Sequence, residues 1–215
     1  MKWTKLGKIC SAGDSELQNS HAAVPTPDLT SFNNEDTTIR IYYSSRDKKQ
    51  SSRPFWIDYD LNQHTVKESS SRFVVDTGEL GTFDDSGVMP SYFLEKNDQR
   101  WMYYIGWMQG KTVRYYTHIG LMIEKNDKFK RYSQAPILNT TKEEPFSPIT
   151  APFLLHDDSG YKMYYAAGKG WDRIAGELNP RYNLRMAESN DGINWTSRGN
   201  VVIDFRWDDE WALTR

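Results

Sequence analysis

The sequence predicts an all-β fold, a β-propeller built from four-stranded antiparallel blades. Three observations carry this prediction: a tyrosine-rich segment recurs at a fixed interval, short aromatic and β-branched runs alternate with turn signals, and no stretch keeps the apolar period of a helix. The segment reads Ile-Tyr-Tyr at residues 41–43 and Met-Tyr-Tyr at residues 102–104 and 163–165, with an interval of 61 residues each time. Equal spacing of this size indicates equal structural units.

Three further landmarks follow each tyrosine pair in the same order. A second apolar run lies at residues 55–57, 119–122 and 184–187. A third apolar run lies at residues 73–75, 136–138 and 201–203. An acidic and aromatic cluster comes next, at residues 83–85, 143–146 and 207–210. A β-sandwich also has many short strands, but it does not predict a sequence repeat, so the constant order favours the propeller.

Each unit is expected to hold about four antiparallel strands. The apolar runs are short and rich in Tyr, Trp, Ile and Val, as strands are. Turn signals separate them, at residues 97–98, 126–127, 157–160 and 190–192. Asp191-Gly192 is a hairpin signal, because a two-residue turn of this kind needs positive φ angles.

The repeat assigns the whole chain to one propeller domain. The blades are expected at residues 20–78, 79–141 and 142–206, and residues 207–215 restart the pattern as the first strand of a fourth blade. Residues 1–19 contain a Trp-Thr and Gly pattern that matches residues 195–199, so they are expected to supply an outermost strand that closes a ring.

Propellers have about 4–8 blades, so three blades and the start of a fourth predict an incomplete ring. A fragment, a truncated gene product and half of an assembly all fit this expectation. The alternative is a compact ring of three blades.

Composition narrows the possible partners. The chain has 215 residues, with 27 lysines and arginines against 29 aspartates and glutamates, and a formal net charge of −2. This balance gives no electrostatic reason to expect binding to nucleic acid or to an anionic membrane. No apolar run approaches the roughly 20 residues of a membrane helix, and the N-terminus has no stretch of signal-peptide length. Because Cys10 is the single cysteine, we expect a cytoplasmic protein.

No cofactor is expected. The four histidines and Cys10 lack metal-ligand spacing. The Gly-Lys-Gly at residues 168–170 lacks the Ser or Thr and the spacing of a phosphate-binding loop.

The loops that enter the first strands of the blades are expected to meet at one mouth of the central channel. These segments are residues 21–25, 84–90, 143–152 and 208–215, and all but the first bring carboxylates. Glycoside hydrolysis needs one protonated carboxyl as general acid and one ionised carboxylate as base or nucleophile. Clustered carboxylates separate these two roles, because like charges raise one of the pKa values.

Four segments resemble the five-bladed β-propeller glycosidase superfamily, which includes glycoside hydrolase families 43, 32, 68 and 130. They are residues 83–91, 101–107, 119–121 and 189–195. The chain looks most like relatives found in bacterial polysaccharide loci. The resemblance covers about residues 20–215, the first three-fifths of a five-bladed ring. It is more specific for the fold than for an activity.

The resemblance to family 43 implies an Asp base from blade 1, a pKa-tuning Asp from blade 2 and a Glu acid from blade 3. On this pattern Asp85, or less well Asp84, is the tuning carboxylate, and Glu144, with Glu143 next to it, is the general acid. The base has no clear match, because Ala22 follows His21 where the family has Asp. Glu210 is the candidate substitute, which completes the predicted catalytic set.

Five further residues are expected to bind substrate: His21, Asp84, Trp107, Trp171 and Arg215. Simpler interpretations stand beside these roles. The pair Asp84-Asp85 is also typical of an Asx turn, and Glu143-Glu144 is also typical of a solvated loop. His21 also suits a hydrogen-bonded channel position without chemistry.

The predicted function is a glycan-acting protein, a glycoside hydrolase of bacterial polysaccharide metabolism, with an oligo- or polysaccharide as its partner. One alternative is a non-catalytic carbohydrate-binding propeller, which the missing Asp after His21 favours. Another is an inactive truncated fragment. Unpaired blade edges are expected to promote self-association.

Overall fold

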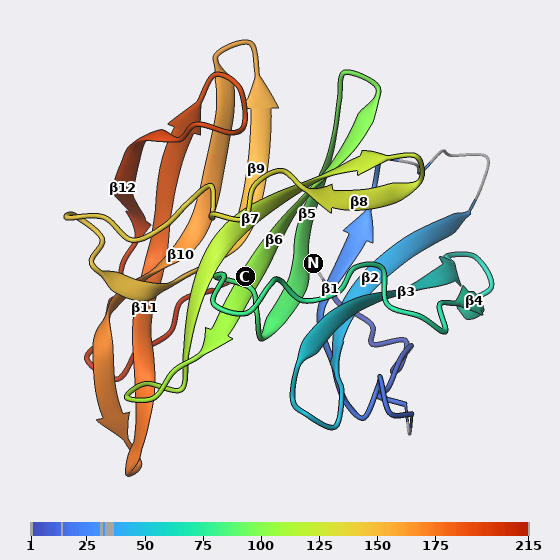
Figure 1. Cartoon of the computed structure of the whole chain (residues 1–215), viewed down its shortest axis with the longest axis horizontal. Coiled ribbons are helices and arrows are strands. Elements are labelled where there is room, and N and C mark those ends of the chain that lie inside the picture. The colour runs from blue at the N-terminus through green and yellow to red at the C-terminus, as the bar shows by residue number, and fades with distance from the viewer. Residues whose placement is uncertain (1, 14, 31, 33–36, 215) are drawn as a thin grey trace.

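The computed structural model describes residues 2–13, 15–30, 32 and 37–214. The described residues form twelve β-strands and no helix, in two hydrogen-bonded sheets (Figure 1). The all-β class predicted from the sequence is therefore confirmed. Among the same residues, no helix has the length and apolar character required to cross a membrane.

The strands form three consecutive antiparallel groups of four, which we call the first, second and third meander. The first meander contains β1 (Ser20–Asp28), β2 (Thr38–Arg46), β3 (Ser52–Asp60) and β4 (Thr65–Ser69). The second contains β5 (Gly87–Lys96), β6 (Gln99–Gln109), β7 (Tyr115–Lys125) and β8 (Lys128–Arg131). The third contains β9 (Phe146–Asp157), β10 (Gly160–Ile174), β11 (Glu177–Ser189) and β12 (Thr196–Ile203).

The third strand of each meander contacts the segment that begins the next unit, and we call these contacts the joints. At the first joint, Ser52 of β3 pairs in parallel with Gly87, which merges the first two meanders into one sheet. At the second, the Thr117 amide of β7 donates to Ser147 Oγ at 2.8 Å. At the third, Tyr182 of β11 pairs in parallel with Ala212. Ser52, Thr117 and Tyr182 lie 65 residues apart, so residues 211–213 contact the third meander as residues 86–87 contact the first.

The core lies between neighbouring meanders, because side chains alternate between the two faces of each sheet. Tyr42 packs with Met102 and Tyr104 between the first and second meanders. Tyr103 packs with Met163 and Tyr165 between the second and third. The two tyrosines of a pair therefore point to opposite faces, which explains why both recur.

The third apolar run does not form the fourth strand of the first two meanders. Residues 73–75 and 136–138 follow β4 and β8, and they cover the core instead. Leu138 is fully buried and forms an isolated bridge with Ile119. Only residues 201–203 lie in a fourth strand, β12. Apolar residues that cover the edge of a core have the same composition as a strand. Composition therefore predicts strands at residues 73–75 and 136–138, where the structure has covering segments.

The N-terminal segment forms no strand over residues 2–13. Trp3 is 86% exposed there. The partner expected for this segment is the last blade of a closed ring, and the described residues contain no such blade. The closing role of residues 1–19 therefore stays a prediction.

Candidate functional site

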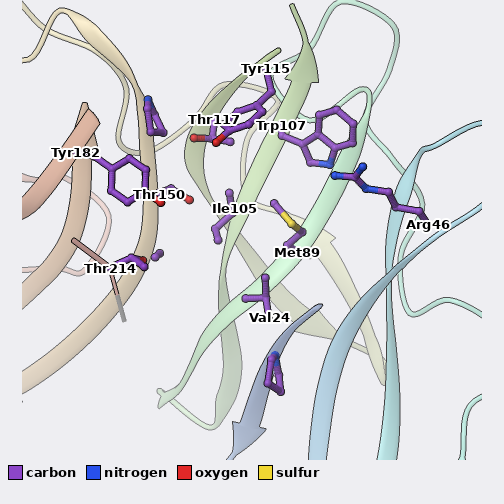
Figure 2. A pocket seen from close by; sticks show the side chains of 13 residues that line it. Val24, Arg46, Met89, Ile105, Trp107, Tyr115, Thr117, Thr150, Tyr182 and Thr214 are labelled. Atoms are coloured by element: carbon purple, nitrogen blue, oxygen red, sulfur yellow. The ribbon is translucent and has the colours of Figure 1, made fainter. Parts of the chain in front are cut away.

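A pocket of about 790 Å³ lies where the first strands of the meanders meet (Figure 2). Four segments contribute to its wall, and they are those that the sequence predicts to meet. Their lining residues are Val24 and Pro25 of β1, Met89 of β5, Pro148, Thr150 and Ala151 of β9, and Thr214 near the described C-terminal end. The segments converge as expected, although the residues that they place in the pocket are not the predicted carboxylates.

Aromatic side chains from the second and third strands complete the wall. Trp107 comes from β6, Tyr115 from β7 and Tyr182 from β11. Figure 2 shows Tyr182 on one side of the pocket and Trp107 with Arg46 on the other. Burial raises the pKa of Tyr115 and of Tyr182. Both hydroxyls therefore stay protonated at neutral pH and can donate as well as accept hydrogen bonds.

The charge in this wall is positive. Arg46, at the end of β2, lines the pocket with its Cζ 5.2 Å from the ring centroid of Trp107. Among the described lining residues, none is an aspartate or a glutamate. This wall therefore suits polar or anionic groups better than cations.

Gly87 lets the Trp107 ring lie close to the backbone at the first joint. A Cβ atom at Gly87 would lie 2.0 Å from Trp107 Nε1 and 2.7 Å from the Ser52 side chain. Any larger residue would push the indole away from this position. The glycine at the start of β5 thus sets the shape of one pocket wall.

Two of the predicted carboxylates lie instead in a repeated buried arrangement, which we call the tyrosine clasp. In the second meander, Asp84 Oδ2 accepts a hydrogen bond from the Tyr104 hydroxyl at 3.0 Å and from Arg131 Nε at 2.8 Å. Arg131 Nη2 also donates to the Asp76 carbonyl at 2.7 Å. Asp84 is fully buried.

The third meander repeats the clasp with a glutamate. Glu144 accepts from the Tyr165 hydroxyl at 2.9 Å and from Arg198 Nε at 3.0 Å, and Arg185 lies at 3.5 Å. Arg198 also donates to the Asn139 carbonyl, as Arg131 does to Asp76. Burial, with the nearby Glu144 charge, raises the pKa of Tyr165 to about 12.

The first meander has a reduced clasp, in which the Tyr43 hydroxyl donates to Gln18 Oε1 at 2.8 Å. Tyr43, Tyr104 and Tyr165 are 61 residues apart. In each case the tyrosine holds the segment that leads into the first strand of its meander. The clasp therefore has a structural role that recurs with the fold.

Comparison with known proteins gives the family. No protein-family model matches the chain. The uncharacterized proteins MT1551 and Rv1502, from two strains of Mycobacterium tuberculosis, are each 32% identical to it over 218 residues. These residues cover 100% of this chain and 71% of each relative. The chain belongs to the family of these two proteins.

Several solved structures that are similar to this chain are glycoside hydrolases. An α-L-arabinofuranosidase from Lactobacillus brevis has a TM-score of 0.62 at 12% identity, over 90% of this chain and 59% of that structure. The family 117 glycoside hydrolase Zg3597 from Zobellia galactanivorans has a TM-score of 0.62 at 13% identity, over 91% and 60%. A thermostable family-43 glycoside hydrolase has a TM-score of 0.58 at 14% identity, over 85% and 55%. The chain thus spans about three-fifths of these structures, and at such identities the likeness shows the fold alone.

The predicted catalytic carboxylates of this family member do not line the pocket. Asp85 is half-buried and accepts from the Gly81 amide at 3.0 Å and the Ser86 hydroxyl at 2.8 Å. Glu144 lies in the third clasp. Glu210 caps its own turn, where it accepts from the backbone amides of residues 206 and 207. The catalytic roles of all three stay predictions.

The predicted substrate-binding residues divide between the pocket and other places. Trp107 lines the pocket. Trp171 does not line it, but its ring packs against that of Tyr115, which does, with the ring centroids 5.6 Å apart. His21 is exposed, with Nδ1 2.9 Å from Ser20 Oγ. Asp84 lies in the second clasp. Arg215 lies outside the described residues.

Sequence reasoning did not select Arg46, Tyr182 or Thr117, which also line the pocket. A usable signal exists for Arg46. It follows the first tyrosine pair by three residues, as Trp107 follows the second. Once Trp107 is taken as a pocket residue, the repeat predicts Arg46. Among the described residues, no group of three His, Cys, Asp or Glu side chains is arranged to hold a metal ion.

Proposed function

We propose that the pocket binds a glycan. The observation that supports it best is the pairing of aromatic rings on opposite sides, Tyr182 against Trp107, with threonine hydroxyls between them (Figure 2). A sugar ring has apolar C–H faces, which pack on aromatic rings, and hydroxyls at its edge, which need hydrogen-bond partners. Thr150, Thr117 and Thr214 offer such partners from three different segments.

We also propose that the meanders are blades of a five-bladed ring, with residues 20–78, 79–141 and 142–206 as the first three blades. The equivalence of the joints supports this, because residues 211–213 contact β11 as the start of a further blade would. Residues 1–19 would supply the closing strand. The relatives and the similar structures are longer than this chain, in agreement with a ring that needs more residues.

Glycan binding is tested by titrating the full-length protein with a panel of mono- and oligosaccharides in a calorimeter. We expect binding that weakens about tenfold in Tyr182→Ala, since burying an aromatic face is worth on the order of 1–2 kcal/mol. Tyr132→Ala is the matched control, because Tyr132 is 50% exposed and does not line the pocket. A panel in which no saccharide binds, or equal affinities for both variants, would refute the proposal.

Hydrolysis is the second candidate function, and Asp85 is the residue that favours it. Its described hydrogen bonds come from an amide and a hydroxyl, so no positive charge occupies it. It precedes Ser86, whose amide donates to the Trp107 carbonyl at 3.2 Å. Asp85 is thus the predicted catalytic carboxylate that the hydrogen bonds tie most directly to the pocket wall. In this candidate, Glu144 and Glu210 would be its general acid and its base.

The hydrolytic candidate is tested by the release of reducing sugar from any glycan that binds. A general acid or base contributes about 10²–10⁴-fold to the rate. We therefore expect Asp85→Asn, Glu144→Gln and Glu210→Gln to lose activity by that factor while glycan affinity survives. Glu143→Gln, at an exposed neighbouring position, serves as control. If the wild-type protein binds a glycan but releases no sugar, the hydrolytic candidate is refuted and only the carbohydrate-binding function stands.

A further inference from the structure

Arg46 differs from the other half-buried arginines of the fold. Arg40 binds Asp58 at 2.7 Å, Arg53 binds Asp47 at 2.6 Å, and Arg131 binds Asp84 at 2.8 Å. The guanidinium of Arg46 forms no hydrogen bond or ion pair with any described residue, and its contact is with the face of the Trp107 ring. Its donors are therefore available to a molecule in the pocket.

Backbone pairing on both sides fixes the position of Arg46 beside the pocket. Its register partners are Ser20 on β1 and Ser52 on β3, so the residue sits between two neighbouring strands. The Trp107 ring supports the planar guanidinium, a stacking arrangement that arginine favours. A positioned guanidinium in a wall without described carboxylates attracts an anion, and the apolar surroundings strengthen the attraction.

A second observation in the same pocket points to a ligand. Thr117 is only 4% exposed and lines the pocket, and its Oγ1 atom has no hydrogen-bond partner among the described residues. A buried hydroxyl without a partner destabilises the fold, because it has lost its hydrogen bonds to water. This atom is closed off from solvent, so a ligand hydroxyl or acid oxygen would supply the missing partner once the Thr117 side chain turns toward the pocket.

We infer that the pocket selects an acidic sugar, whose anionic group binds the Arg46 guanidinium while the ring packs between Tyr182 and Trp107. The inference rests on the proposed glycan-binding function and adds the class of sugar. A carboxylate, as in a uronic acid, a sulfate ester and a phosphate ester all present paired oxygens to the arginine fork. The shared chemistry is a sugar with a fixed negative charge.

The test compares each acidic sugar with its neutral parent on the full-length protein. Calorimetry would measure methyl glucuronide, glucose 6-sulfate and glucose 6-phosphate against methyl glucoside, and methyl galacturonide against methyl galactoside. We expect at least one acidic sugar to bind about tenfold or more tightly than its parent, since hydrogen bonds to a charged group are stronger than those between neutral groups. The identity of that sugar separates the carboxylate, sulfate and phosphate sources. The preference should shrink in about 0.5 M salt, which screens an accessible ion pair.

Arg46→Met removes the charge and keeps the apolar stem, so it should abolish the preference while neutral sugars still bind. Arg46→Lys keeps the charge without the fork and should retain part of the preference. Arg72→Met is the matched control, because Arg72 is exposed and does not line the pocket. Equal unfolding midpoints for the Arg46 variants and the wild type would show that the fold is intact.

Two results would overturn the inference, and only one of them would also refute the proposed glycan-binding function. Neutral and acidic sugars that bind equally well, or a preference that survives Arg46→Met, would refute acidic selection and leave glycan binding standing. Failure of every sugar to bind would refute both the inference and the function on which it rests.

Discussion

Glu144 illustrates at the scale of one residue how the same carboxylate suits two interpretations. The sequence places it where the resemblance implies a general acid. The structure surrounds it with Tyr165, Arg198 and Arg185, and its side chain is fully buried. Spacing along the chain indicates which unit a carboxylate belongs to. The arginines that surround Glu144 come from β11 and β12, and nothing in the sequence indicates that they contact it.

Glu144→Gln separates the two interpretations. Replacing a structural carboxylate leaves two half-buried guanidinium groups without their charged partner, and breaking a fully buried ion pair costs about 3–5 kcal/mol, which is the upper bound here. We expect urea unfolding to show a loss of up to this size in Glu144→Gln and almost none in Glu143→Gln. A variant of unchanged stability that loses only turnover would favour the catalytic interpretation instead.

His118 makes stability depend on pH. Burial on β7 lowers its pKa from 6.5 to about 4. The unfolded chain therefore takes up a proton between pH 6.5 and 4 that the folded protein refuses, so stability falls as the pH drops through this window. The loss contributed by His118 should reach about 3 kcal/mol near pH 4.

Unfolding midpoints measured across this window in wild type and His118→Leu would show the effect. We expect the variant to lose less stability on acidification than the wild type. His64→Asn is the control, because His64 is an exposed turn residue with a φ of 55°, which Asn tolerates. Identical pH profiles for wild type and His118→Leu would contradict the prediction.

At the scale of the element, the turn between β11 and β12 connects local sequence to packing. Asp191 Oδ1 accepts from the amides of Ile193 and Asn194, both at 2.8 Å. A turn is present where the sequence predicts one, but it runs over residues 190–195 and is longer than the two-residue hairpin turn that Asp191-Gly192 predicts. The Gly192 carbonyl then accepts from the buried Tyr103 hydroxyl of the second meander at 2.9 Å. The turn therefore ties two meanders together.

Gly192→Ala should be more harmful than a turn substitution usually is. Gly192 has a φ of 75°, and a Cβ atom there would lie 2.8 Å from the Tyr103 hydroxyl. Gly176 has a similar φ of 86° with open space around it. We expect Gly176→Ala to cost about 1 kcal/mol through the backbone alone and Gly192→Ala to cost more, by chemical denaturation. Equal losses would show that the contact with Tyr103 is unimportant.

The sequence predicted the elements unevenly, for a physical reason. Strands next to the tyrosine pairs were predicted in place, because alternation and turn residues are local signals. The runs at 73–75 and 136–138 were predicted as strands and are not, because burial over a core produces the same composition as a ladder. Pocket residues such as Tyr182 come from second and third strands, and only the assembled fold brings them beside the first strands.

At the scale of the whole molecule, the third meander has a face that its equivalents keep covered. Tyr42 and Tyr103 are 2% and 0% exposed and pack against the following meander. Tyr164 is the equivalent residue, and it is only half-buried. Leu155, on the neighbouring strand of the same sheet, is 49% exposed. A face of this composition favours association with another apolar surface.

We expect residues 1–215, produced alone, to form dimers or larger species in sedimentation experiments. Leu155→Lys should shift the population toward monomer, because it places a charge on the uncovered face. Val66→Lys is the control, since Val66 is similarly exposed, at 40%, but lies on β4 of the first meander and not on the third. A monodisperse monomer of the unmodified chain would contradict this expectation.

The joints give the molecule a direction of growth. Because the segment that opens each unit bonds to the third strand of the unit before it, a chain that emerges from the ribosome can build one meander upon the last without waiting for distant residues. Coupling of this kind is between nearest neighbours, as in linear repeat proteins. Amide exchange should accordingly be slowest in β6 and β7, which have a meander on each side, and should quicken toward β4 and β12.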